Sequence, residues 1–141
     1  MDKLLADPES AALIKLLNPQ FERPVQPFMR LAYVDAIQWL NEHGIKHEEE
    51  DADGNVIRDA HGIAKMVDHV VGDDIAEAAE RRMTDIIGKP IFLHSFPAEL
   101  KAFYMKKIPG TTGGKVFTES CDLLMPGVGE IVGECMLLSR Q

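Results

Sequence analysis

The sequence has few cysteines and no long apolar run. Cys121 and Cys135 are the only cysteines among 141 residues, too few for a disulfide scaffold or for a zinc site made of four thiolates. No stretch approaches the roughly 20 consecutive apolar residues that span a bilayer. The segment Met1–Asp7 lacks the apolar core of a secretory signal. We therefore expect a cytoplasmic protein with no membrane contact.

Basic residues are also scarce. Fifteen lysines and arginines stand against 23 aspartates and glutamates, which gives a net charge of −8 at pH 7. Broad electrostatic binding of nucleic acid needs clustered positive charge, so the composition argues against it, though not against a local contact with RNA. With 45% hydrophobic and 27% charged residues, the chain has the composition of one globular domain or of a piece of a larger one.

Apolar periodicity and the positions of proline and glycine predict the elements of the first half of the chain. Residues 7–17 read as a helix that Asp7 caps, with its leucines on one face. Two prolines then predict an extended connection over residues 20–27. A strand over residues 28–32 leads directly into an amphipathic helix that runs until Gly44.

The second half of the chain is predicted to be rich in strands. An acidic insertion over about residues 45–72, with a short helix around 63–70, precedes a helix that Asp73 or Asp74 caps and Gly88 ends. The strand candidates that follow are residues 91–96, 103–105, 116–125 and 130–138. Because strands and helices do not alternate strictly, the pattern favours an α+β fold over a doubly wound parallel sheet.

Two acidic residues on the last two predicted strands are candidate metal ligands. If the turn at residues 126–129 makes these strands antiparallel, Asp122 and Glu130 lie on neighbouring strands and could approach one divalent cation. Such hard oxygen ligands suit Mg²⁺, with substrate phosphates completing its coordination. The spacing by itself favours the alternative, in which Glu119, Asp122 and Glu130 only decorate a hydrated sheet face.

The histidines do not form a recognisable metal-binding motif. His43 and His47 have helical spacing for two ligands, but Gly44 should break the helix between them. His61 and His69 lie in the acidic insertion. The sequence therefore does not predict a zinc site.

Five segments of the chain together resemble a known family. They are residues 18–21 (NPQF), 33–40 (YVDAIQWL), 72–85 (GDDIAEAAERRMTD), 96–105 (FPAELKAFYM) and 122–133 (DLLMPGVGEIVG). In this order they resemble segments of eukaryotic cytosolic asparaginyl-tRNA synthetases, and the match is closer than to aspartyl enzymes. The resemblance covers nearly the whole chain except the acidic insertion.

This resemblance implies part of a class II catalytic domain, built on an antiparallel sheet flanked by helices. Such a domain activates asparagine with ATP and esterifies it to tRNA(Asn), and the enzymes of this family are homodimers. Glu130 matches the family's ATP- and Mg²⁺-binding glutamate, and Asp122 matches the acidic residue that shares the metal. Gly133 matches a position lining the amino-acid pocket, where a missing side chain lets the substrate approach the backbone.

The chain also departs from the family pattern. After Gly133 the family continues with glycine, serine, methionine and an arginine that clamps the amino acid, whereas here the residues are Glu134, Cys135, Met136 and Leu137. Neither the second and third signature motifs nor the anticodon-binding domain is recognisable. We therefore expect residues 1–141 to be a partial catalytic domain, inactive by itself. The alternatives are a non-catalytic interaction module derived from this fold, or an aspartate-specific or asparagine-synthetase-like paralogue.

The segment 96–105 contains one pair of charged residues that can be interpreted in two ways and one pair of aromatic residues. Glu99 and Lys101 are two residues apart on a strand-like segment, which the resemblance places beside the catalytic sheet. A surface ion pair that contributes little is equally compatible with their spacing. Phe103 and Tyr104 lie in an apolar run and are predicted to be core aromatics.

Overall fold

The structure of the chain is a computed structural model in which residues 2–19, 21, 23, 25–110 and 114–135 are described. The departures from the family pattern at Met136 and Leu137 lie outside the described residues, as does the end of the strand predicted over 130–138. None of the described helices has the length and apolar character needed to cross a lipid bilayer.

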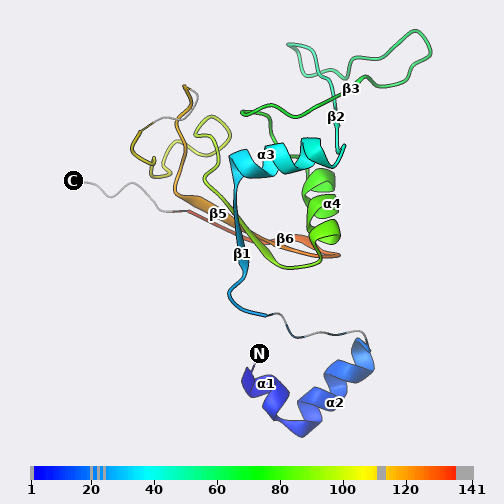
Figure 1. Cartoon of the computed structure of the whole chain (residues 1–141), viewed down its shortest axis with the longest axis vertical. Helices are drawn as coiled ribbons and strands as arrows, with labels where there is room; N and C mark the ends of the chain where they lie inside the picture. The colour runs from blue at the N-terminus through cyan, green and yellow to red at the C-terminus, as the bar shows by residue number, and fades with distance from the viewer. Residues whose placement is uncertain (1, 20, 22, 24, 111–113, 136–141) are drawn as a thin grey trace.

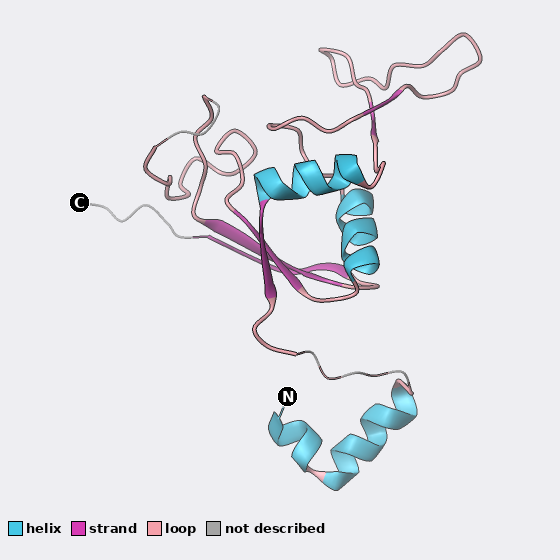
Figure 2. Ribbon diagram, in the orientation of Figure 1, coloured by secondary structure: helices cyan, strands magenta, loops and turns pink. Residues whose placement is uncertain are grey.

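A mixed sheet of four strands lies at the centre of the described chain (Figures 1 and 2). In spatial order its strands are β1 (Met29–Ala32), β4 (Ile91–His94), β5 (Ser120–Met125) and β6 (Gly129–Cys135). β1 runs parallel to β4, whereas β4 with β5 and β5 with β6 are antiparallel. The predicted α+β fold with a mainly antiparallel sheet and flanking helices is therefore confirmed.

Two helices cover one face of this sheet. α3 (Tyr33–Glu42) contacts β1 and β4, and α4 (Glu77–Ile87) contacts β5 and β6. Alternate residues of the strands point toward the helices, and the buried hydrophobic ones are Leu31, Ile91, Leu93 and Leu124. They meet buried side chains that recur every three or four residues along α3 and α4, namely Tyr33, Ala36, Ile37, Leu40, Ala79 and Met83.

The start of α4 differs from the prediction. The helix begins at Glu77, and its N-cap residue, Ala76, makes no side-chain cap hydrogen bond. The predicted cap at Asp73 or Asp74 is wrong, because the Asp73 carboxylate instead accepts the N–H of Val70 at 2.7 Å. The predicted end is confirmed, since Gly88 adopts a left-handed conformation and its N–H bonds within the last turn.

The first two helices stand apart from the sheet. α1 (Asp2–Ala6) and α2 (Pro8–Leu17) contact each other and lie at one end of the molecule (Figure 1). The predicted cap is confirmed, because Asp7 Oδ2 accepts the N–H of Ser10 at 2.9 Å. None of the ten residues of α2, all of which are described, is buried. The leucine face that the sequence predicts therefore covers nothing in the described chain.

The acidic insertion forms a long hairpin beyond the end of α3 (Figure 1). At its base β2 (His47–Glu48) pairs antiparallel with β3 (Met66–Val67). The short helix predicted around residues 63–70 is wrong, because these residues pair across the hairpin instead of bonding along a helix.

Two of the strand predictions in the second half are also wrong. Phe103 and Tyr104 form a turn, and their exposed fractions of 89% and 49% exclude them from the core. The strand predicted over 116–125 begins only at Ser120, since the residues before it make isolated bridges to Pro97 and Lys107. Residues 95–110 and 114–119 thus form loops at one end of the sheet (Figure 1).

Candidate functional site

The last two strands bring the predicted acidic residues onto one face of the sheet. Asp122 lies opposite Gly133, and Leu124 lies opposite Glu130. Between these two pairs the register shifts, leaving Ile131 as the extra residue of a β-bulge. Residues directly opposite each other in a ladder share a face. The bulge therefore puts Glu130 and Gly133 on the face of Asp122, although regular alternation would put them on opposite faces.

The missing side chain of Gly133 leaves the space in which two carboxylates converge. A Cβ atom placed on Gly133 would lie 2.6 Å from Oε1 of Glu130 and 3.0 Å from Oδ1 of Asp122. Both oxygens thus point at one position above the glycine. Asp122 is 6% exposed, whereas Glu130 is exposed. The arrangement offers two hard oxygen ligands with one side open to solvent.

Lys101 fixes the orientation of Asp122. The Nζ atom of Lys101 lies 3.0 Å from Oδ2 of Asp122 and 3.8 Å from the ring centroid of Phe96. Asp122 therefore uses one oxygen for the lysine and turns the other toward Glu130. Glu99 binds elsewhere, since its carboxylate pairs with Lys115 at 2.9 Å. Of the two interpretations of this segment, Lys101 fits the one beside the acidic cluster and Glu99 fits a surface ion pair.

Glu80 on α4 adds a third carboxylate that the sequence reasoning missed. It lies on the buried face of the helix and is 9% exposed. Burial, together with the charges of Asp122 and Glu130, raises its pKa from 4.5 to about 7. The signal was present in the sequence, because Glu80 precedes Met83 and Thr84 at helical spacing and thus shares their apolar face.

This carboxylate makes stability depend on pH. Because the folded pKa of Glu80 lies above its ordinary value of 4.5, the folded chain binds more protons between pH 4.5 and about 7. The free energy of unfolding should then fall as the pH rises through this window, by at most on the order of 3 kcal/mol. Glu80→Gln should flatten this fall, as measured by urea denaturation at a series of pH values in chelator. Glu99→Gln is the control, and an unchanged slope in Glu80→Gln would refute the prediction.

Charge in the cluster fits a divalent cation. Three carboxylates meet here, those of Glu80, Asp122 and Glu130. Among the described charged groups that act on Glu80, one is basic, the ammonium group of Lys101. Burial is the largest cause of the raised pKa of Glu80, and the charges of Asp122 and Glu130 add to it more than Lys101 offsets. A divalent cation bound between Oδ1 of Asp122 and Oε1 of Glu130 would compensate these negative charges through oxygen ligands. The third predicted acidic residue, Glu119, instead pairs with Lys106 at 2.9 Å.

The sequence of the chain matches one known protein family over most of its length. Residues 6–140 match the sequence model of the tRNA synthetases of class II, the group of the D, K and N enzymes. The chain belongs to this family.

The chain is similar in sequence to asparagine–tRNA ligases. The chain is 50% identical over 139 residues to the probable cytoplasmic asparagine–tRNA ligase of Schizosaccharomyces pombe, which covers 99% of this chain and 21% of that protein. It is 52% identical over 133 residues to the cytoplasmic asparagine–tRNA ligase of Saccharomyces cerevisiae, covering 94% of this chain and 21% of that protein. The chain therefore spans about a fifth of the length of these relatives.

Solved structures show the same relationship. The asparaginyl-tRNA synthetase of Entamoeba histolytica has a TM-score of 0.73 and 42% identity, and the match covers 97% of this chain and 26% of that one. The same enzyme in complex with asparaginyl-adenylate gives a TM-score of 0.75. The aspartyl enzyme of that organism, at 22% identity and a TM-score of 0.65, shares the fold. The resemblance expected from the sequence is confirmed, and its alternatives gain no support from these proteins.

Proposed function

We propose that the chain is part of the catalytic domain of a cytoplasmic asparagine–tRNA ligase, which activates asparagine with ATP and Mg²⁺ and transfers it to tRNA(Asn). The observation that carries the proposal is the convergence of Asp122 and Glu130 above Gly133. It occurs in a chain about half identical to asparagine–tRNA ligases. A similar solved structure holds asparaginyl-adenylate, the intermediate that such an activation forms.

Each residue of the cluster has a distinct part in this proposal. Asp122 and Glu130 hold Mg²⁺, and Glu130 thereby also binds ATP. The bound ion would neutralise the negative charge of the phosphates. Lys101 keeps one oxygen of Asp122 occupied, so that the other stays aimed at the metal position. Gly133 is proposed to line the asparagine pocket beside these two carboxylates, whose oxygens take the space that a side chain would occupy.

The whole enzyme is proposed to act as a homodimer, with ATP, asparagine and tRNA(Asn) as its partners. This chain corresponds to about a fifth of the relatives, and residues that position the substrate act together in catalysis. We therefore expect no asparagine-dependent ATP–pyrophosphate exchange from the chain alone. A non-catalytic module would share that result, so the decisive experiment places the cluster in a complete enzyme.

The test is a chimera in which residues 29–133 replace the corresponding segment of the Saccharomyces cerevisiae relative. We expect the chimera to catalyse ATP–pyrophosphate exchange that depends on asparagine and not on aspartate. In this chimera Glu130→Gln should lower kcat/KM by about 100-fold or more, because a ligand to the charge-stabilising ion is lost. Glu119→Gln is the matched control and should keep the activity.

Two outcomes would contradict the proposed function. The first is a folded chimera, judged by circular dichroism and thermal melting, that shows no exchange while the parent enzyme does. The second is exchange that survives Glu130→Gln. Preference for aspartate would instead support the aspartate-specific alternative.

A further inference from the structure

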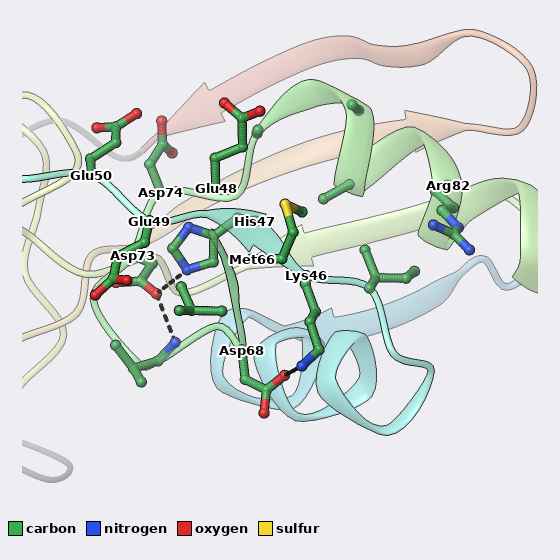
Figure 3. Close-up of a pocket in the computed structure, with 16 residues that line it drawn as sticks. Lys46, His47, Glu48, Glu49, Glu50, Met66, Asp68, Asp73, Asp74 and Arg82 are labelled. Atoms are coloured by element: carbon green, nitrogen blue, oxygen red, sulfur yellow. Dashed lines mark hydrogen bonds and ion pairs between the residues drawn. The ribbon is translucent and has the colours of Figure 1, made fainter. Parts of the chain in front are cut away.

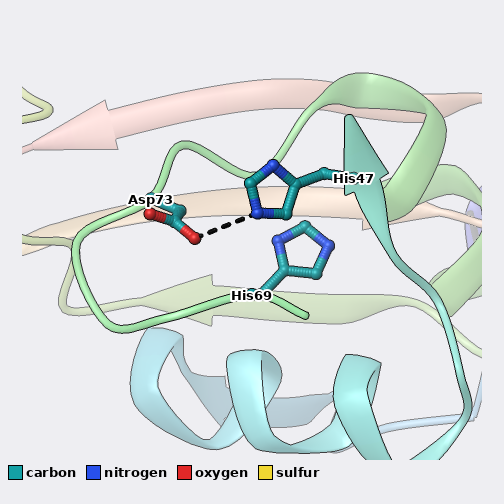
Figure 4. Close-up of side chains that lie close together, drawn as sticks. All are labelled: His47, His69 and Asp73. Atoms are coloured by element: carbon teal, nitrogen blue, oxygen red, sulfur yellow. Dashed lines mark ion pairs between the residues drawn. The ribbon is translucent and has the colours of Figure 1, made fainter. Parts of the chain in front are cut away.

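Three side chains meet at the base of the hairpin, outside the carboxylate cluster. His47 comes from β2, His69 from the segment after β3, and Asp73 from the loop before α4 (Figure 4). One possible ligand atom of each lies within 4.8 Å of those of the other two. His69 and Asp73 lie four residues apart on one connection, so what the fold adds is His47, which is more than 20 residues earlier in the chain.

His69 is buried, and its ring packs against that of His47 with the ring centroids 4.6 Å apart. It is 2% exposed, and neither of its ring nitrogens has a hydrogen-bond partner among the described residues. A buried polar group left in this way costs free energy, which a ligand on that group would recover. Burial and the neighbouring His47 lower the pKa of His69. The neutral imidazole is the form that coordinates metal ions.

His47 and Asp73 already have the spacing of two ligands of one ion. Nε2 of His47 lies 3.2 Å from Oδ2 of Asp73, yet it makes no aligned hydrogen bond to any described residue. In a tetrahedral zinc site with bonds of about 2.0–2.1 Å, neighbouring ligand atoms are about 3.3 Å apart. The distance thus fits coordination of a shared ion, and the possible ligand atom of His69 lies within 4.8 Å of the other two.

The backbone that carries two of these ligands is fixed to the core through α3. The side-chain amide of Asn41 donates to the carbonyl of His69 and accepts its N–H, both at 2.8 Å. The hydroxyl of the buried Tyr33 donates to the carbonyl of Asp73 at 2.6 Å and accepts the N–H of Gly72 at 2.9 Å. A metal site benefits from such support, because the ligands need little reorganisation on binding.

The surroundings of His47 favour a cation and give it access. His47 lines a pocket whose wall carries several carboxylates, including Glu48, Glu50 and Asp74 (Figure 3). Their negative charge raises the local concentration of cations. The side chains of His47 and Asp73 are 29% and 26% exposed, so a water molecule has room as a fourth ligand.

We propose that His47, His69 and Asp73 bind one Zn²⁺ ion. Two imidazoles and one carboxylate are a common ligand set for zinc and are softer than the oxygen ligands that Mg²⁺ prefers. The ion links β2 to the connection between β3 and α4. It thereby closes the long loop between His47 and His69. This zinc site uses none of the residues assigned to asparagine activation, so it stands or falls independently of that activity.

The test is a zinc titration of the full chain, freed of metal and kept in excess Mg²⁺ so that the carboxylate cluster is occupied. We expect one Zn²⁺ per chain, a higher thermal midpoint on binding, and visible absorption typical of tetrahedral Co²⁺ when cobalt replaces zinc. His47→Ala and Asp73→Asn should each weaken zinc binding by about 100-fold or more, since losing a direct ligand exceeds the 10–100-fold cost of losing its support. His61→Ala, an exposed histidine of the same hairpin, should bind as the unmodified chain does.

A second measurement needs no variant. In ¹⁵N spectra of the histidine side chains, zinc should shift the ring signals of His47 and His69 and leave those of His61 in place. A native chain that takes up no stoichiometric zinc would overturn the site, leaving His47 and Asp73 as a simple ion pair. Binding that survives both His47→Ala and Asp73→Asn, or ring shifts confined to other histidines, would overturn it as well.

Discussion

Gly133→Ala should leave the chain folded and weaken divalent-cation binding at the β5–β6 hairpin by about 10-fold or more. The added methyl group would lie 2.6 Å from Oε1 of Glu130, closer than a real contact allows. Because Glu130 is exposed, its carboxylate can swing away at little cost in folding free energy. It then no longer converges with Asp122, so the change acts on the ion and not on the fold.

Manganese binding followed by electron paramagnetic resonance, together with urea denaturation, separates these two effects. Val132→Ala is the matched control, because Val132 lies on the same strand opposite Leu123, on the other face of the hairpin. It should change neither property strongly. Unchanged manganese affinity in Gly133→Ala would show that the ion does not lie between Asp122 and Glu130, and a collapse in stability would show that the glycine is needed for packing instead.

Lys101→Met should lower the free energy of unfolding at pH 8 by about 3 kcal/mol. The side chain of Asp122 is 8% exposed, and removing its cation leaves a buried carboxylate next to Glu80 and Glu130 without compensation. The contact of Nζ with the Phe96 ring is lost too. At pH 5 the loss should be smaller, because the charge of Lys101 lowers the pKa of Glu80, and without it this carboxyl group binds a proton more readily.

Urea denaturation at both pH values measures this effect. Lys115→Met is the control, since Lys115 pairs with Glu99, whose side chain is 65% exposed, and exposed pairs contribute about 1 kcal/mol or less. Adding Asp122→Asn to Lys101→Met should recover part of the stability, because it removes the unpaired charge. Equal losses in the Lys101 and Lys115 variants would mean that the Lys101–Asp122 pair is effectively solvated.

The chemistry of the site was only partly visible in the sequence. Asp122 and Glu130 were candidates because a turn separates two strand-like segments, and the structure indeed turns between Met125 and Gly129. The bulge at Ile131, which aligns Glu130 with Gly133, has no such signal. It depends on how β6 pairs with its neighbour and not on the residues within a few positions.

The family and the elements whose causes are local could be predicted from the amino-acid sequence alone. Asp7 caps its helix through a residue three positions away, and Gly88 ends another by its own backbone conformation. Such features depend on neighbours within one turn, so they are readable before any fold is known.

Which side chains are buried together depends on how distant segments pack in the folded chain. Asp73 has the chemistry of a helix cap, but in the fold it lies beside His47, which is 26 positions earlier in the chain. Glu80 has a raised pKa because α4 packs over β5 and β6. Burial and the convergence of charges arise from contacts between distant segments, and no pattern of a few residues encodes them.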